Sequence, residues 1–441
     1  MLMQFFLLSA SLKLYSERTF AQKSFFLKYL HSDLSPCEDH KCQKRTNTLE
    51  EKNKIVTFVG LNLDIKHKNR MEGELIKTYK WLTPISWIYG LVTYVRNRLF
   101  DWEVLPSKRY DIPVIAVGNI TIGGTGKTPH IEYLIRLLST NYKVAVLSRG
   151  YKRKSRGYVL ATPETPMEMV GDEPWQMAQK FSNIYVAVDA NRCRGIEHLI
   201  NDPETKDVQV ILLDDAFQHR YVTPGRNILL TDYHRLITQD MILPAGRLRE
   251  SAQGKERANM VIVTKCPEDI SPMQYRIIAE SLKLRPYQQL YYSSFRYGKM
   301  VNMSTYEMRS LQDMKQCNVL LATGIGCPKQ MKMDIAKRFA SVESMDFRDH
   351  HYYDQGDIED ISRRLEKLPK PHIIITTEKD ATRLLSMENL PDEIACHIWV
   401  LPIKIHFLQG KAAMFNDKIT GYVQKNHRNS RMAQSKNDNK A

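Results

Sequence analysis

The chain has 441 residues, 43% of them hydrophobic, and its 64 basic and 49 acidic side chains give a formal net charge of +15 at pH 7. This length excludes a single ordinary core and predicts a globular protein of two domains. The positive charge favours anionic partners, namely phosphates, an acidic membrane surface or nucleic acid, without choosing among them. Seven scattered cysteines, an odd number without paired CxxC spacing, indicate free thiols in a reducing compartment.

The first 70 residues differ from the rest of the chain. Short apolar runs such as MLMQFFLLSASL are followed by a polar, mixed-charge stretch without sustained periodicity. The opening lacks the basic start and the small-residue cleavage site of a signal peptide. We therefore expect Met71 to be a natural start and residues 1–70 to be an extension without an assigned role.

An uncharged aromatic stretch, WLTPISWIYGLVTYV at Trp81 to Val95, lies within the next segment, 71–111, between lysines and arginines on both sides. Fifteen residues are too few to span a bilayer, and Pro84 interrupts them. Aromatic side chains with basic flanks are typical of a helix that lies on an anionic membrane surface. A helix packed on the domain's own core fits the same apolar pattern, so both interpretations stay open from these residues alone.

A strand, a glycine-rich loop and a helix follow one another from Ile112 to Leu138. IPVIAV at Ile112 to Val117 is typical of a buried parallel strand, and the apolar residues after Thr128 recur at helical spacing. Glycines in the loop allow backbone N–H groups to turn towards an anion, and the helix N-terminus adds partial positive charge. Lys127 is expected to reach the β- and γ-phosphates of a nucleotide, and the Thr128 hydroxyl to ligate Mg²⁺.

This loop departs from the usual phosphate-binding consensus at one position. Thr121 stands where the first glycine is expected, so the first bend is predicted to be made elsewhere, such as at Gly118. The context of strand and helix still favours a nucleotide site over an ordinary turn. The predicted nucleotide-binding residues are Thr121, Gly123, Gly124, Thr125, Gly126, Lys127 and Thr128.

A second apolar strand, Val208 to Leu213, delivers the pair Asp214 and Asp215. Adjacent acids often only end a strand at the surface, but after a phosphate-binding loop they favour a Walker-B arrangement that holds Mg²⁺. Further apolar runs alternate with helical or loop stretches, which predicts an α/β fold of the P-loop NTPase kind with a mostly parallel sheet and helices on both faces. Ligands are expected at the carboxyl ends of the strands.

Charged residues follow these predicted strands. A basic run occupies 149–156, Arg192 follows another strand, and Arg247 lies in LPAGRLRES. Such residues are usually solvated, yet beside a nucleotide they can neutralise phosphoryl charge. Asp172 and Glu173 precede a predicted helix, where acids commonly cap the N-terminus. The functional interpretation makes Asp172 the acceptor of a substrate hydroxyl proton.

Two absences narrow the nucleotide class. Ile122 occupies the position of an extra lysine in the deviant P-loop ATPases, and TKCP at Thr264 to Pro267 lacks the Asn and Asp with which GTPases read guanine. ATP is therefore preferred over GTP. The predicted kinase domain covers 112–290, a hinge 291–315, a smaller α/β domain 316–425, and a disordered tail 426–441.

Several of these stretches, in their order along the chain, resemble the tetraacyldisaccharide 4′-kinase family of lipid A biosynthesis from about Met71 to Gly421. The stretches are NITIGGTGKTP, LSRGYKRKSRG, VGDEP, DDAFQH, LPAGRLRES, GIGCP, FRDHHYYD and TTEKDATRL. The resemblance implies transfer of the γ-phosphoryl of ATP to the 4′-hydroxyl of a tetraacylated disaccharide 1-phosphate. It also implies a peripheral enzyme, expected to be monomeric, on the cytoplasmic face of the bacterial inner membrane, and it accounts for a surface helix on the anionic leaflet.

The resemblance also implies roles for individual residues. Lys127 and Thr128 contact phosphates and Mg²⁺, and Asp172 is the general base. Asp215 orients a histidine of the DHH motif, taken as His350, and Asp214 lies near the metal. Arg192 and Arg247 stabilise phosphate charge, the loop 149–156 meets the anomeric phosphate of the substrate, and the two domains close for catalysis.

Two alternatives remain open from the sequence. One is a P-loop kinase of a soluble acceptor, in which the aromatic helix only packs. The other is a nucleotide-dependent switch that binds nucleic acid through its basic loops. The second is ranked last, because aromatic residues do not alternate with the basic run as they do in single-strand binding surfaces.

Overall fold

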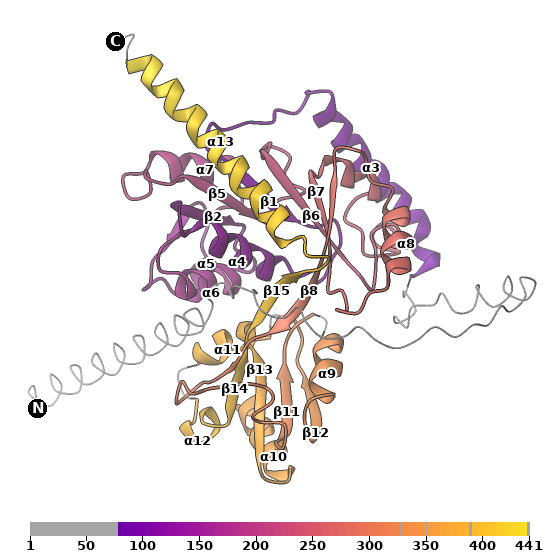
Figure 1. Ribbon diagram of the computed structural model, residues 1–441, viewed down its shortest axis with the longest axis vertical. Coiled ribbons are helices and arrows are strands. Elements are labelled where there is room, and N and C mark those ends of the chain that lie inside the picture. The colour runs from indigo at the N-terminus through magenta and orange to yellow at the C-terminus, as the bar shows by residue number, and fades with distance from the viewer. Residues whose placement is uncertain (1–77, 327, 350, 388–389, 439–441) are drawn as a thin grey trace, which may run out of the picture.

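The structure is a computed structural model that describes residues 78–326, 328–349, 351–387 and 390–438, with side chains as far as Asn426. It has a large α/β lobe and a smaller one, joined where β8 and β15 pass between them (Figure 1). Residues 1–70, Met71 and His350 lie outside the described residues, so the predictions made for them stay predictions.

A nine-stranded sheet forms the centre of the large lobe, in the order β15-β8-β7-β6-β1-β5-β2-β4-β3. All neighbours from β8 to β4 are parallel, and only the edge strands β15 and β3 are antiparallel. The strands are β1 Val114–Gly118, β2 Val144–Ser148, β3 Val159–Ala161, β4 Tyr185–Val188, β5 Val210–Asp214, β6 Arg226–Asp232, β7 Met260–Thr264, β8 Gln289–Tyr297 and β15 Ile403–Phe407. Strands β1, β2, β5 and β7 are buried throughout, as expected for apolar strands covered on both faces. The predicted fold class is confirmed.

Helices cover both faces of this sheet. The predicted apolar face of the helix after the glycine loop is confirmed. The main core contains four residues of this face of α4: Ile131, Leu134, Ile135 and Leu138. The helices of the large lobe are η1 Lys80–Leu82, α3 Thr83–Asp101, α4 Lys127–Leu138, α5 Met167–Val170, α6 Asp172–Lys180, α7 Arg192–Asn201, η2 Ala252–Arg257, α8 Pro272–Leu282 and α13 Ala412–Asp438.

The smaller lobe contains a six-stranded sheet in the order β10-β9-β14-β13-β11-β12, in which β14, β13, β11 and β12 are parallel. Its strands are β9 Met300–Asn302, β10 Met308–Arg309, β11 Asn318–Thr323, β12 Ser341–Asp346, β13 His372–Thr377 and β14 Ile398–Leu401. Its helices are α9 Lys329–Ala336, α10 Gln355–Lys367, α11 Glu378–Leu385 and α12 Asp392–Ala395. The smaller lobe is therefore itself an α/β unit, with strands from Met300 to Leu401.

The domain boundaries differ from those predicted. Strand β8 stays in the large sheet as far as Tyr297, and β15 pairs with it, so the chain passes between the lobes at Gly298–Lys299 and again at Pro402. Helix α13 then lies across the large lobe, where Phe415, Ile419 and Val423 join the main core (Figure 1). These apolar residues recur every fourth position and form one helical face. Residues 403–425 thus belong to the large lobe, and a helix continues to Asp438 through most of the range predicted as disordered.

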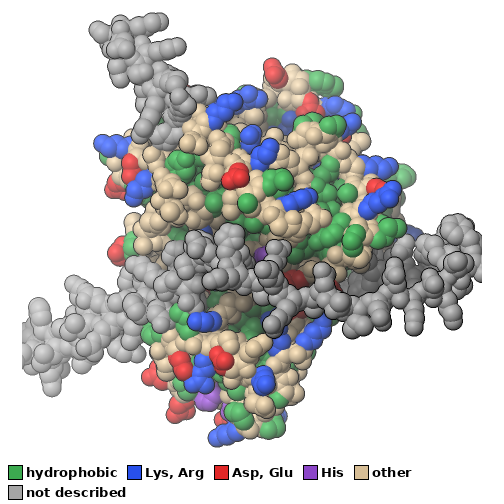
Figure 2. All heavy atoms as spheres, in the orientation of Figure 1, with side chains coloured by type: hydrophobic (Ala, Val, Ile, Leu, Met, Phe, Trp, Pro, Cys, Tyr) green, Lys and Arg blue, Asp and Glu red, His purple; other side chains and the backbone are tan. Residues whose placement is uncertain are grey.

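Helix α3 extends further than the aromatic stretch that predicted it, and Pro84 lies in its first turn instead of interrupting it. The helix is anchored by the Tyr89 hydroxyl, which donates to the Arg249 carbonyl, and by Asn97, whose amide donates to Glu250. Much of its apolar surface is nevertheless exposed, at Ile85, Trp87, Ile88, Leu91, Val92 and Val95. Figure 2 shows apolar and basic side chains together on the side of the large lobe where α3 and α8 lie. No helix within the described ranges has both the length and the apolar character needed to cross a membrane.

Candidate active site

A cavity of about 920 Å³ lies where the two lobes meet. Its large-lobe wall is formed by the glycine loop and by the segments that follow β2, β4 and β5, which is the edge of the sheet where ligands were expected. Helix α3 contributes Tyr89, Thr93 and Asn97, and the smaller lobe contributes Gly326, Asp349 and the start of α11. The cavity is therefore built by both lobes and by the exposed helix.

The glycine loop has the backbone geometry of an anion site. Gly126 precedes α4 with a φ of 83°, Gly123 has a φ of 115°, and Gly124 does not share this left-handed conformation. Thr125 accepts a hydrogen bond from Asn119 at 2.8 Å, and its carbonyl accepts one from Thr264 at 2.9 Å. The loop is thus held from behind, and its glycines line the cavity.

Gly118 does not make the bend that was predicted for it. It is the last residue of β1, and a Cβ built on it would lie 2.8 Å from Cβ of Phe217. The glycine is required because β1 and the DDAFQH segment approach closely. Thr121 pairs with Leu248 and is not one of the lining residues, so it supports the loop from outside the cavity.

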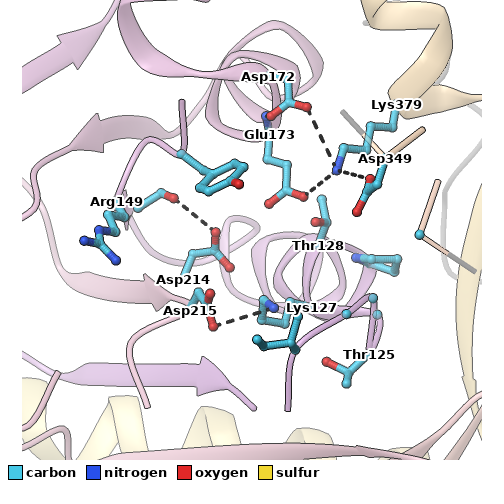
Figure 3. Close-up of a pocket in the computed structure, with 18 of the residues that line it drawn as sticks. Thr125, Lys127, Thr128, Arg149, Asp172, Glu173, Asp214, Asp215, Asp349 and Lys379 are labelled. Carbon is cyan, nitrogen blue, oxygen red and sulfur yellow. Dashed lines mark hydrogen bonds and ion pairs between the residues drawn. The ribbon is translucent and has the colours of Figure 1, made fainter. Parts of the chain in front are cut away.

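Lys127 lies within the cavity and faces Asp215, with 3.6 Å between Nζ and Oδ1 (Figure 3). Asp215 also contacts Arg249, whose Nη1 is 3.2 Å from Oδ2. Burial acts to raise the pKa of Asp215, but the charges of Lys127 and Arg249 lower it overall. Asp215 is therefore an ionised partner of Lys127. Its predicted contact with His350 stays a prediction.

Asp214 is placed beside the loop by the parallel register of β1 and β5, which aligns it with Val117. Only 2% of it is exposed, and its Oδ2 accepts a hydrogen bond from Ser148 at 3.1 Å. Its buried Oδ1 has no hydrogen-bond partner among the described residues. Burial, together with the charges of Glu173 and Asp215, raises its pKa to about 7. A buried carboxylate with an unused oxygen fits a cation, which supports the predicted pairing of Asp214 with Thr128 as metal ligands.

The two arginines predicted to bind phosphate have different positions. Arg192 lines the cavity but is 2% exposed, and its guanidinium donates to the carbonyls of Asp189 and Asp214. It therefore fixes the ends of two strands, and burial lowers its pKa to about 10. Arg247 is exposed and is not among the lining residues, whereas Arg249 of the same motif lines the cavity. The choice of Arg247 is corrected to Arg249, because the loop aims the second arginine inwards.

Asp172 begins α6 and faces α11 of the smaller lobe, as Figure 3 shows. Its Oδ2 lies 2.7 Å from Nη2 of Arg383 and 3.9 Å from Nζ of Lys379. Lys379 also lies 3.0 Å from Glu173 and 3.8 Å from Asp349. Burial tends to lower the pKa of Lys379, but Glu173 and Asp172 raise it overall, so the ammonium stays charged.

Lys379, Arg383 and Asp349 were not proposed from the sequence. All of them lie in quoted motifs, TTEKDATRL and FRDHHYYD, but their spacing gave no sign that they would meet Asp172. His351 is engaged within its own lobe: its Nε2 lies 2.6 Å from Asp357 and its ring stacks on Phe347. Because His351 is occupied in this way, we keep His350 as the candidate histidine of the DHH motif.

Comparison with known proteins decides the family. A model of the family described as tetraacyldisaccharide-1-P 4′-kinase matches residues 78–423. The chain belongs to this family. The resemblance predicted from the motifs is thereby confirmed, and with it the assignment as a kinase.

Curated members of the kinase family are similar over nearly their whole length. The tetraacyldisaccharide 4′-kinase of Phocaeicola vulgatus is 54% identical over 363 residues, covering 82% of this chain and 99% of that protein. The one from Bacteroides thetaiotaomicron is 52% identical, covering 83% and 99%. Among solved structures, LpxK from Aquifex aeolicus in complex with ATP is 26% identical with a TM-score of 0.60, covering 79% of this chain and 99% of that one.

Proposed function

We propose that this protein transfers the γ-phosphoryl group of ATP to the 4′-hydroxyl of a tetraacyldisaccharide 1-phosphate, a lipid A precursor, and so forms lipid IVA. The observation that carries the proposal is the cavity in which Lys127 of the glycine loop and Asp172 of α6 are both lining residues. Membership of the 4′-kinase family supports the choice of acceptor.

The large lobe is suited to the triphosphate. The glycine loop and the first residues of α4 line the cavity, a helix N-terminus favours an anion, and Lys127 supplies a positive charge. Thr128 and Asp214 would hold Mg²⁺, which neutralises charge on the phosphates when bound. Asp215 and Arg249 keep the Lys127 side chain directed into the cavity.

Asp172 is suited to receive the proton of the acceptor hydroxyl. In this step the hydroxyl oxygen bonds to the γ-phosphorus, the proton passes to the carboxylate, and ADP leaves. A histidine in the DHH motif, His350 paired with Asp215, remains part of the proposal. Because phosphoryl transfer has a loose transition state, positioning and charge contribute more than base strength. Arg149, which is exposed at the cavity, and Arg192 behind it supply positive potential for the phosphates of the substrate.

Helix α3 is suited to an anionic membrane surface. Trp87 is 72% exposed and Leu91 62%, which is unusual for side chains that serve only as core packing. The same helix lines the cavity with Tyr89 and Thr93, so an acylated substrate can reach the loop while its chains stay in the bilayer. This favours a peripheral membrane enzyme over a kinase of a soluble acceptor. A monomer on the cytoplasmic face of the inner membrane is part of the proposal. The proposed function includes no nucleic-acid partner.

The decisive experiment is a transfer assay with ATP, Mg²⁺ and a tetraacylated disaccharide 1-phosphate in mixed micelles. Labelled phosphate should appear at the 4′ position, and a disaccharide already phosphorylated there serves as the blocked control. Hydrolysis of ATP without any labelled lipid would overturn the proposed acceptor.

A further inference from the structure

Arg383 belongs to the smaller lobe, but its guanidinium donates a hydrogen bond to a carboxylate of the large lobe, that of Asp172. It lies on α11 with its side chain 1% exposed, and Nη2 donates to Oδ2 of Asp172 at 2.7 Å. Nη1 donates to Oδ1 of Asp380 at 3.0 Å and to the Gly324 carbonyl at 3.1 Å. A planar guanidinium with partners on both of its terminal nitrogens has a fixed orientation.

The partners of this arginine are themselves fixed. Asp380 is fully buried, and its Oδ2 accepts hydrogen bonds from the Gly324 N–H at 3.0 Å and the Thr377 hydroxyl at 2.7 Å. On the other side, Oδ1 of Asp172 accepts the N–H of Glu173 at 2.9 Å. The Asp172 carboxylate is therefore held from one side by its own helix and from the other by the smaller lobe.

Acidic side chains surround the contact between Asp172 and Arg383. Within the described part of the chain, the titratable groups in contact with Asp172 or with its partners include Glu173 on α6, Asp349 after β12, Lys379, Asp380 and Arg383 on α11, and Tyr353 before α10. Carboxylates outnumber cations in this set, and clustered buried carboxylates tend to take up protons. Burial acts to lower the pKa of Arg383, but its hydrogen bond with Asp172 and the nearby carboxylates raise it, so it stays charged.

We propose that Arg383 is the positioning residue for the acceptor of the hydroxyl proton: it keeps the Asp172 carboxylate ionised and oriented, and it does so only while the two lobes are in contact. Proton removal from the acceptor is thereby coupled to the approach of the lobes. Lys379, at 3.9 Å from Asp172, is too distant to replace the direct hydrogen bond. The inference rests on the proposed role of Asp172.

The test compares Arg383→Met and Arg383→Lys with wild type in the lipid transfer assay from about pH 5 to about pH 9. For Arg383→Met we expect kcat at neutral pH to fall on the order of 100-fold, with the acid limb of the kcat profile shifted to higher pH by about one unit. KM for ATP should stay within about twofold, because the triphosphate site is untouched. Arg383→Lys keeps the charge and should show a smaller shift.

Arg235→Met is the matched control, because Arg235 also holds a buried carboxylate, with Nη2 2.6 Å from Oδ1 of Asp240, but lies outside the cavity. Arg235→Met should leave the acid limb of the kcat profile at the same pH as in wild type. A fall in kcat by the same factor at every pH for Arg383→Met would overturn the proposal that Arg383 keeps Asp172 ionised. If that variant does not fold, Arg383→Lys decides: wild-type kcat with an unshifted acid limb overturns the proposal, because lysine cannot reproduce the paired contacts to Asp172 and Asp380.

Asp172→Asn separates this inference from the proposed function. If Asp172 and Arg383 act as a unit, Arg383→Met should cause no further loss in the Asp172→Asn background, whereas multiplying losses overturn the coupling. An Asp172→Asn enzyme with near-normal kcat and an intact acid limb would instead remove Asp172 from the mechanism, whatever Arg383 does.

Discussion

Lys180 and Glu378 form a buried ion pair between the two lobes, with Nζ 2.5 Å from Oε1. Lys180 ends α6, Glu378 begins α11, and the same ammonium lies 2.8 Å from Glu132 of α4. One lysine therefore connects the helix after the glycine loop, the helix of Asp172 and the helix of Arg383. Such a connection is suited to fix the position of the smaller lobe relative to the large lobe.

Removing this lysine should destabilise the protein strongly. Lys180→Met leaves the buried Glu378 carboxylate without its cation and leaves Glu132 with Arg136 alone, and we expect the free energy of unfolding to fall by roughly 3 kcal/mol or more. Chemical denaturation monitored by tryptophan fluorescence measures it. Lys154→Met, which breaks the exposed pair with Glu168, is the control and should change stability by less than about 1 kcal/mol. Equal losses in the two variants would contradict the role of Lys180.

His130 should make stability depend on pH on the acid side. Burial lowers its pKa to about 4, outweighing the effect of Nδ1, which donates to the Gly126 carbonyl at 2.7 Å. The unfolded chain binds the proton near pH 6.5 and the folded one only near pH 4, so stability is lost as pH falls through this range. The loss from this residue is on the order of 3 kcal/mol at most.

Glutamine at position 130 cannot titrate, so His130→Gln should flatten the fall in the free energy of unfolding between about pH 6.5 and about pH 4. Urea denaturation at several pH values compares the variant with wild type. Parallel curves for the two proteins would show that another group carries the dependence.

Lys127 and Asp172 should fail in different ways. Lys127→Ala removes the charge expected at the phosphates and should abolish both transfer and tight ATP binding. Asp172→Ala should keep ATP binding while kcat falls by about 100-fold or more. Calorimetry with ATP and Mg²⁺, beside the transfer assay, separates the two effects. Weak ATP binding by both variants would mean that Asp172 serves the nucleotide instead of the acceptor.

Helix α3 should carry membrane association. Trp87→Glu with Leu91→Glu places acidic groups on its exposed face and should abolish flotation with vesicles of anionic phospholipid, because burial of aromatic area is lost and anionic lipid is repelled. Met333→Glu on α9, an exposed apolar residue of the smaller lobe, is the control and should still float. Persistent flotation of the α3 variant would locate the docking surface elsewhere.

The sequence was sufficient to predict those parts of the candidate site whose residues are neighbours in the chain. A buried strand, glycines, Lys127, Thr128 and an apolar helix are neighbours in the chain, so local backbone preferences fix their geometry. Asp214 could be found the same way, because a parallel strand delivers its last residue to the edge of the sheet where the glycine loop lies. These elements also carried the resemblance to the 4′-kinase family.

Long-range pairing decided the rest. No local pattern showed that β15 would return to the large sheet, that Arg249 and not Arg247 would face the cavity, or that Arg383 would bind Asp172, 211 residues away in the chain. These contacts depend on strand register and on how the two lobes meet, which local propensities do not specify. The sequence alone thus determined the glycine loop with Lys127 and Thr128, and the tertiary structure determined which side chains surround Asp172.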